Sequence, residues 1–233
     1  MKSETMKRIK LLLLLLLTVC LSVSAQEDSV RHEVLFETSM GNIRVVLYNE
    51  TPLHRDNFLK LVNSGFYDGI LFHRVIDRFM IQAGDPTSKT ARAGELLGEN
   101  SEGERIPAEI VYPKLFHKRG ALAAARQSDE ENPARESSGS QFYIVYGKRY
   151  TANRLFDIDG KIMRNTNHQY KLSDELYEYY QNVGGSPHLD GQYTVFGEVV
   201  EGIDVVANIE KVETDENNRP LEDVKIIRAT VIK

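Results

Sequence analysis

The segment 72–85, FHRVIDRFMIQAGD, constrains the fold of this chain more than any other. Apolar and polar side chains alternate along it with the period of two that is typical of a half-buried strand. If residues 77–78 form a turn, the segment becomes a hairpin in which Arg74, Phe79 and Gln82 converge. A fixed cation beside an apolar pocket and an amide suits the binding of a peptide carbonyl. A strand with one arginine that snorkels to solvent is the alternative.

The hairpin segment resembles the signature of the cyclophilin-type peptidyl-prolyl cis-trans isomerases, and later blocks resemble this family in the same order. GALAAAR at 120–126, followed by SGSQFYI at 138–144, is similar to the second pocket-forming block of the family. LDGQYTVFGEVVEG at 189–202 is similar to the third. The resemblance extends from about Val34 to the C-terminus, and one long insertion interrupts it.

The periodicity of the chain indicates many short strands and two helices. Residues 34–38 and 42–48 alternate around a hairpin turn, and residues 224–232 have strand character again. Helices are predicted over 51–65 and 202–211. Such a pattern favours a barrel whose open ends are covered by the helices. The resemblance implies an all-β dominated fold: an eight-stranded antiparallel closed β-barrel capped by two α-helices.

The first predicted helix has clear start signals. Thr51 is expected to be its N-cap, ahead of a proline in the first turn. Helical spacing places Leu53, Phe58, Leu61 and Val62 on one buried face.

The long insertion occupies about residues 147–187, where the family usually crosses in a few residues. A short helix is predicted there, with Ser173 as its cap and Leu176, Tyr180 and Val183 on one face. An amphipathic face usually means burial within the same domain. We therefore favour a packed element that covers an edge of the barrel over an arm that docks a partner.

The resemblance also implies a catalytic and substrate-binding set. The expected catalytic residues are Arg74, Phe79 and Gln82. The expected substrate-binding residues are Met80, Ala125, Arg126, Gln141, Tyr143, Leu189 and Tyr193. Arg74 matches the catalytic arginine, whose forked donors can hold the proline carbonyl and face the prolyl nitrogen.

The remaining roles follow from the same match. Apolar pocket residues would hold the pyrrolidine ring, and Gln82 would anchor a substrate carbonyl. The backbone of Ala125 and Arg126 would pair with the peptide as an added strand does. Gln141 would support Arg74 from behind, and Tyr193 would stand at the rim. The long loop at 87–105 is expected to border the peptide groove.

This chain departs from the usual pattern at several of these positions. Tyr143 stands where the family usually has Phe, Arg126 where many relatives have Asn, and Tyr193 where His is frequent. The dipeptide at 77–78 replaces a Pro-Gly turn, which could change the stiffness of the loop without removing a reacting group.

Composition excludes several other functions. The net charge is −5 and the isoelectric point is about 5.7, and the basic residues are scattered, so nucleic acid is not an expected partner. The histidines lack metal-ligand spacing, and His73 is expected to be a hydrogen-bonded core residue. No metal or cofactor is expected. The expected partners are proline-containing segments of unfolded or partly folded proteins, and a monomer is expected.

Residues 1–25 have the pattern of a secretory signal peptide, with basic residues, a leucine run and small residues before cleavage after Ala25. The mature domain would be 26–233, without stable membrane insertion, because the apolar segment is too short. Cys20, the only cysteine, would be removed. These features predict an exported protein of the bacterial periplasm. A lipid anchor on Cys20 is less favoured, because Val19 is bulkier than lipoprotein signals prefer.

The leading hypothesis is a peptidyl-prolyl isomerase that rotates X-Pro bonds in exported proteins during folding. The alternative is a catalytically weak peptide-binding module or a holdase chaperone of the cell envelope. A sugar- or lipid-binding barrel is a third possibility, which the absence of tryptophan disfavours.

Overall fold

The computed structural model describes residues 31–233, so the predicted signal peptide and Cys20 lie outside the described residues. Residues His32–Lys233 form one structural unit. Its strands are β1 (Glu33–Thr38), β2 (Gly41–Leu47), β3 (Phe72–Ile76), β4 (Met80–Ala83), β5 (Ala121–Ala124), β6 (Phe142–Val145), β7 (Val195–Glu201) and β8 (Ile226–Val231). Its helices are α2 (Pro52–Asn63), α3 (Ala152–Asn165), α4 (Asp174–Asn182) and α5 (Ile203–Ile209), with 3-10 turns η1 (Pro86–Thr90) and η2 (Pro187–Leu189).

The strands form one eight-stranded sheet in the order β3-β4-β6-β5-β7-β2-β1-β8, in which every neighbouring pair is antiparallel. The sheet curls so that its two edges meet. The backbone N–H of Phe72 donates to the carbonyl of Val224 at 2.8 Å, and that of Ile226 donates to Ile70 at 2.8 Å. The predicted antiparallel barrel is therefore confirmed, although this short bridge, rather than a full ladder, closes it.

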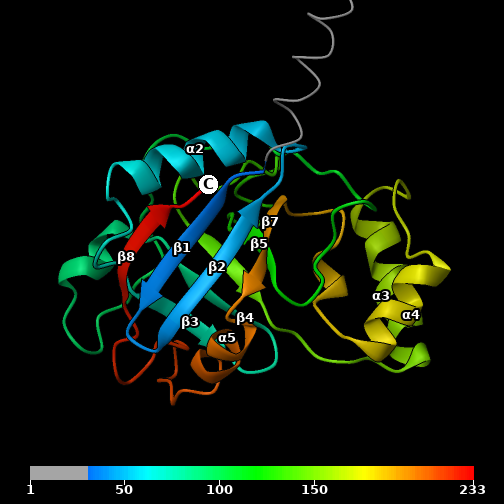
Figure 1. Ribbon diagram of the computed structural model, residues 1–233. Helices are drawn as coiled ribbons and strands as arrows, with labels where there is room; N and C mark the ends of the chain where they lie inside the picture. The colour runs from blue at the N-terminus through cyan, green and yellow to red at the C-terminus, as the bar shows by residue number, and fades with distance from the viewer. Residues whose placement is uncertain (1–30) are drawn as a thin grey trace, which may run out of the picture. The chain divides into compact units, whose positions relative to one another are not determined.

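The two predicted capping helices are present, and they cover opposite ends of the strands (Figure 1). α2 places Phe58 in the main core, where its ring lies 5.5 Å from Phe142 and 5.1 Å from Tyr67. α5 contributes Val206 and Ile209, which are fully buried. Inward residues of the strands fill the space between these helices, and this rigid core supports the neighbouring site.

The start of α2 differs from the prediction. The Thr51 side chain caps no helical N–H. Instead, the carboxylate of Glu109 accepts hydrogen bonds from the backbone N–H groups of Leu53 at 3.1 Å and His54 at 3.0 Å. A carboxylate satisfies these free donors and complements the helix dipole. The buried face is also shifted, because Leu53 is 51% exposed and His54 is buried in its place.

The insertion contains two helices, of which only α4 was expected from the sequence. The Ser173 cap is confirmed, because its hydroxyl accepts from the N–H of Leu176 at 3.4 Å. α3 was missed although Leu155, Ile158 and Ile162 have helical spacing and are buried. Gly160 and the polar residues around it obscured this pattern.

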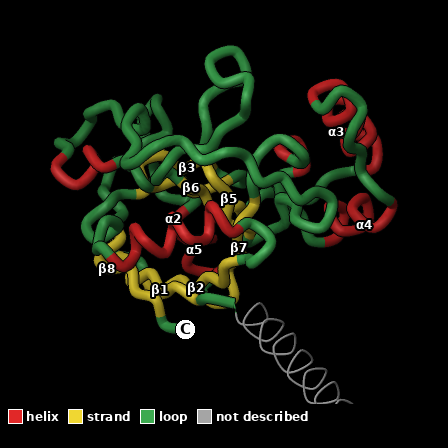
Figure 2. The backbone as a smooth tube through the Cα atoms, turned by 90° about the horizontal axis from the view of Figure 1, so that it is seen from above, coloured by secondary structure: helices red, strands yellow, loops and turns green. Residues whose placement is uncertain are grey.

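Both inserted helices pack against the segment that precedes β5, on the side of the domain away from β8 (Figures 1 and 2). The buried members of this cluster, which we call the insertion core, are Tyr112, Leu155, Ile158, Ile162, Leu172, Leu176 and Tyr180. Val183 was expected on the buried face but is 38% exposed, because it follows the last turn of α4. The preferred prediction is confirmed in that both helices are packed within the domain, whereas cover of a barrel edge stays a prediction.

Two features that define other classes of protein are absent from the described residues. Within 31–233, no helix combines the length and the apolar character that a membrane span requires. In the same part of the chain, no three His, Cys, Asp or Glu side chains are grouped so that they could hold a metal ion.

Candidate active site

The β3-β4 hairpin positions the predicted catalytic residues. The turn at 77–78 is confirmed: the N–H of Phe79 donates to the carbonyl of Ile76 at 3.1 Å. Arg78 takes a left-handed conformation with φ of 58°, which closes the turn tightly. Arg74 then stands opposite Gln82 in the ladder. The hairpin register thus brings the guanidinium and the amide together.

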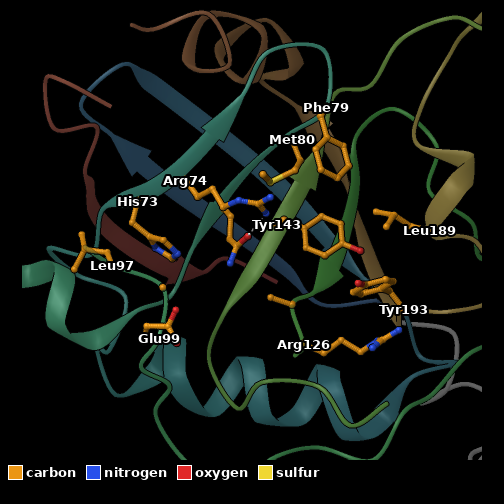
Figure 3. A pocket seen from close by; sticks show the side chains of 13 residues that line it. His73, Arg74, Phe79, Met80, Leu97, Glu99, Arg126, Tyr143, Leu189 and Tyr193 are labelled. Carbon is orange, nitrogen blue, oxygen red and sulfur yellow. Dashed lines mark hydrogen bonds between the residues drawn. The ribbon is translucent and has the colours of Figure 1, made fainter. Parts of the chain in front are cut away.

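A pocket of about 320 Å³, which we call the main pocket, opens on the outer face of this hairpin (Figure 3). Its lining residues are His73, Arg74, Phe79, Met80, Gln82, Leu97, Gly98, Glu99, Ala125, Arg126, Tyr143, Leu189 and Tyr193. Nine of the ten residues predicted for the site are in this set. The tenth, Gln141, lines an adjoining pocket of about 320 Å³.

A chain of side-chain hydrogen bonds holds Arg74 in place. Its guanidinium donates to Gln82 Oε1 at 3.1 Å, and Gln82 Nε2 donates to Gln141 Oε1 at 2.9 Å. Gln141 Nε2 in turn donates to the carbonyls of Gly98 at 2.8 Å and Asn100 at 2.6 Å. Gln141 therefore supports Arg74 through Gln82, and the chain ends on the backbone of the long loop.

The charge of Arg74 is available to a ligand. Among the described residues, no carboxylate forms an ion pair with its guanidinium. Burial lowers the pKa of Arg74, but a guanidinium starts so high that it stays protonated. A fixed positive charge that is not neutralised within the fold can donate hydrogen bonds to a bound carbonyl.

The opposite wall of the main pocket is apolar. Met80 is 1% exposed and Tyr143 is 5% exposed, and the rings of Phe79 and Tyr143 face the space beside Leu189 (Figure 3). The ring of Phe79 lies 5.2 Å from that of His188, which supports it from outside. Burial raises the pKa of Tyr143 well above its usual range, so this wall is uncharged. It suits a small apolar ring.

The strand-pairing prediction needs a correction at Ala125. Its N–H donates to the carbonyl of Gln141 at 3.0 Å, and its carbonyl accepts from Ser138 at 2.8 Å. In an extended strand the N–H and C=O of one residue point to the same side, and those of the next residue point to the other side. Both backbone groups of Ala125 therefore pair with the segment 138–141 and are not free to bind a peptide. The prediction stays open for Arg126, whose guanidinium lies 4.2 Å from the Tyr193 ring centroid and donates through Nε to the neighbouring backbone.

Four lining residues were not predicted as site residues. Leu97, Gly98 and Glu99 come from the long loop that was expected to border the groove, and that expectation is confirmed. His73 faces the pocket because a bulge shifts the register of β3 at this point. The one sequence feature that could have indicated His73 as a site residue is its position next to Arg74.

His73 also differs from its predicted state as a hydrogen-bonded core histidine. Neither ring nitrogen has a hydrogen-bond partner of normal geometry among the described residues. Burial lowers the pKa of His73 to about 4, and the charge of Arg74 acts in the same direction. The ring is therefore neutral at physiological pH, and it serves as a wall of the pocket.

A curled antiparallel barrel with two capping helices, and with a guanidinium and an amide facing an apolar pocket, defines a cyclophilin-like peptide-binding enzyme. The family model "Cyclophilin type peptidyl-prolyl cis-trans isomerase/CLD" matches residues 33–231. The chain therefore belongs to the cyclophilin-type peptidyl-prolyl cis-trans isomerases, which bind proline-containing peptides and isomerise them.

Individual relatives agree with this assignment. Peptidyl-prolyl cis-trans isomerase-like 1 of Aspergillus fumigatus is 32% identical over 86% of this chain and 96% of its own length. Peptidyl-prolyl cis-trans isomerase CYP18-2 of Arabidopsis thaliana is 31% identical over 90% and 99%. A crystal structure of a Cryptosporidium parvum cyclophilin in the presence of the dipeptide Ala-Pro superposes with a TM-score of 0.61, at 27% identity over 86% of this chain and 99% of that chain.

Proposed function

We propose that this chain is an exported isomerase that rotates X-Pro bonds in exported proteins while they fold. The observation that carries the catalytic part is the guanidinium of Arg74, which forms no ion pair with any residue in 31–233 and is held by Gln82 at 3.1 Å beside the apolar wall of the main pocket. The predicted signal peptide at 1–25 supports export to the periplasm.

The chemistry needs only electrostatics and shape. Resonance gives the amide C–N bond double-bond character, and the barrier to its rotation is about 18–20 kcal/mol. In the twisted amide the lone pair is localised on the prolyl nitrogen, and the carbonyl loses polarity. A donor aimed at that nitrogen, in a pocket that excludes water, stabilises the twisted state more than the planar one.

Five side chains of the main pocket have a role in this proposal. Arg74 donates to the proline carbonyl and faces the nitrogen, since its fork offers several donors. Gln82 both orients Arg74 and receives the peptide backbone. Phe79, Met80 and the neighbouring Tyr143 hold the pyrrolidine ring and exclude water.

The physiological need is kinetic. Uncatalysed X-Pro isomerisation takes about tens to hundreds of seconds, and this can limit the folding of a chain after export. An isomerase that is exported with its clients would remove that delay.

A protease-coupled assay on a proline-containing tetrapeptide tests the catalytic part, with purified residues 26–233. We expect turnover in the presence of a metal chelator and without reductant. Peptide binding with no turnover would instead favour the alternative of a holdase or a weak binding module.

Export is tested separately. Periplasmic extracts of cells that express the full chain should contain a mature form that begins at Gln26. A Cys20→Ser variant should be processed in the same way. A membrane-bound form that becomes soluble in Cys20→Ser would show lipidation, and an unprocessed cytoplasmic chain would contradict export.

A further inference from the structure

A chain of buried hydrogen bonds runs from the insertion to the wall of the main pocket. The hydroxyl of Tyr180, on α4, donates to Asp190 Oδ2 at 2.7 Å. Asp190 Oδ1 accepts from the backbone N–H of His117 at 2.8 Å and lies 2.9 Å from His117 Nδ1. His117 Nε2 lies 2.9 Å from the hydroxyl of Tyr143. All four side chains are at most 5% exposed.

The donors and acceptors of this chain can be assigned from chemistry. The carboxylate of Asp190 can only accept, so His117 Nδ1 carries a proton and donates it to Asp190. His117 Nε2 forms the second hydrogen bond of the ring, with the hydroxyl of Tyr143 at 2.9 Å. The direction of this hydroxyl is therefore fixed by a ring that itself cannot turn.

The ring of Tyr143 is also enclosed by neighbouring rings. It stacks on His117 with centroids 6.0 Å apart and an interplanar angle of 12°. Tyr193 meets it edge-on at 6.2 Å and 80°. The hydroxyl of Tyr143 is held by His117, and its ring is in contact with the rings of His117 and Tyr193. These contacts fix the face that Tyr143 presents to the main pocket.

The end of the insertion is fixed to the same histidine. The N–H of Ser186 donates to the carbonyl of His117 at 2.8 Å. A Cβ at Gly185 would lie 2.4 Å from that carbonyl oxygen and 2.8 Å from Tyr180 Cε1, so only glycine allows this close approach. The insertion is thus built tightly against His117, and small displacements of Tyr180 are transmitted to it.

We propose that Tyr180 is a positioning residue for the isomerase reaction. Through Asp190 and His117 it holds the hydroxyl of Tyr143, and so it sets the wall that contacts the proline ring. The insertion therefore contributes to affinity for the proline site without touching the substrate. This inference rests on the isomerase activity of the family, and it is independent of the export role.

The direction of the effect follows from where the wall acts. The proline ring occupies the pocket in both the planar and the twisted state, so a misplaced wall weakens both by similar amounts. A loss of uniform binding raises KM and leaves kcat nearly unchanged.

The test uses the full chain and removes one hydroxyl at a time. For Tyr180→Phe we expect KM for a proline tetrapeptide to rise about three- to tenfold, with kcat within about twofold. Tyr179→Phe is the matched control, because it removes a hydroxyl from the same helix that takes no part in the chain, and we expect no change in KM. In a Tyr143→Phe background, Tyr180→Phe should change KM by less than about twofold, because the two changes break one chain.

The outcomes separate this role from a merely structural one. An unchanged KM in Tyr180→Phe, or the same increase with and without the Tyr143 hydroxyl, would overturn the proposal. The ¹⁵N shifts of His117 in the unaltered chain give a second measurement that needs no variant. We expect a proton on Nδ1, where it faces Asp190, whereas an Nδ1 without a proton would overturn the assignment even if Tyr180→Phe fails to fold. Absence of turnover in the unaltered chain would contradict the activity itself, and the ¹⁵N result would still stand.

Discussion

The main pocket and the insertion core contain similar residue types but serve different purposes. Both gather tyrosines and aliphatic side chains. In the insertion core, the side chains of α3 and α4 fill one another's space, and Tyr180 is fully buried. In the main pocket, Phe79 of the hairpin turn and Tyr143 of β6 line a space of about 320 Å³ that no side chain fills. The same chemistry gives stability where packing is complete and binding where the sheet prevents it.

Polar groups differ between the two regions in a corresponding way. The chain from Arg74 to Gln141 ends in a guanidinium that faces a ligand site. The chain from Tyr180 to Tyr143 is closed, since each polar atom that it joins is used within the fold. Buried polar chains that are fully satisfied rigidify their surroundings, and this one lies where the two regions meet.

The largest effect is expected when the positive charge of the main pocket is removed. Arg74→Ala should lower kcat/KM by about a hundredfold or more with the fold intact, because the donor for the twisted amide is lost. Arg74→Lys should also be poor, since a point charge does not reproduce the fork. Protease-coupled turnover and circular dichroism are the measurements. Full activity in Arg74→Ala would show that the apolar wall alone suffices.

A cavity made in the insertion core tests whether this cluster contributes to the stability of the fold. Ile162→Ala should lower the free energy of unfolding by about 2–5 kcal/mol in urea titrations, because the side chain is fully buried. The control Phe156→Ala, on the same helix but 74% exposed, should change it by less than about 0.5 kcal/mol. Two separate unfolding transitions would show that the insertion is not part of the cooperative unit.

The turn beside the main pocket offers a smaller, pH-dependent test. Burial raises the pKa of Glu210 to about 7 from an ordinary value of 4.5, and Asp77 adds to this, while the N–H of Arg78 donates to Glu210 at 2.9 Å. The folded state therefore binds this proton more tightly than the unfolded state. The resulting stabilisation is fully present below about pH 4.5 and is lost as the pH rises through about 7.

Glu210→Gln should accordingly raise the melting temperature at pH 8 by no more than about 2–4 °C, after allowance for solvent screening, and should have little effect at pH 4.5. The exposed Glu222→Gln serves as the control. A stabilisation that is equal at both pH values would contradict the raised pKa of Glu210.

The smallest expected effect concerns the pH dependence of turnover. Burial lowers the pKa of both His73 and His188 to about 4, so both rings are neutral from about pH 6 to pH 9, while Arg74 stays charged. We expect kcat/KM to vary by less than about twofold over this range. A bell-shaped profile would contradict this. A step near pH 7 that disappears in Glu210→Gln would assign the titration to the turn rather than to the pocket.

Local patterns were sufficient for much of the site. Arg74, Phe79 and Gln82 lie within nine residues of one hairpin, so strand alternation and one turn predict that they converge. The capping helices were predicted for the same reason, because apolar periodicity is a local property. The Ser173 cap likewise depends on a residue three positions away.

Contacts between distant segments escaped prediction. The cap of α2 comes from Glu109, more than fifty residues after the helix begins, where a local signal had pointed to Thr51. The bulge that turns His73 to the pocket depends on the partner strand. Nor does any sequence pattern indicate that both backbone groups of Ala125 are used by 138–141.

The sequence by itself determined where the main strands and the two capping helices lie, because apolar side chains recur along them with periods of 2 and 3.6 residues. It thereby determined the hairpin that carries Arg74. Only the tertiary structure decided that Tyr180, His117 and Tyr143 form one chain through Asp190, because the fold brings together segments separated by up to 73 residues. Hydrogen bonds act over about 3 Å, and only the folded backbone sets such distances between remote residues.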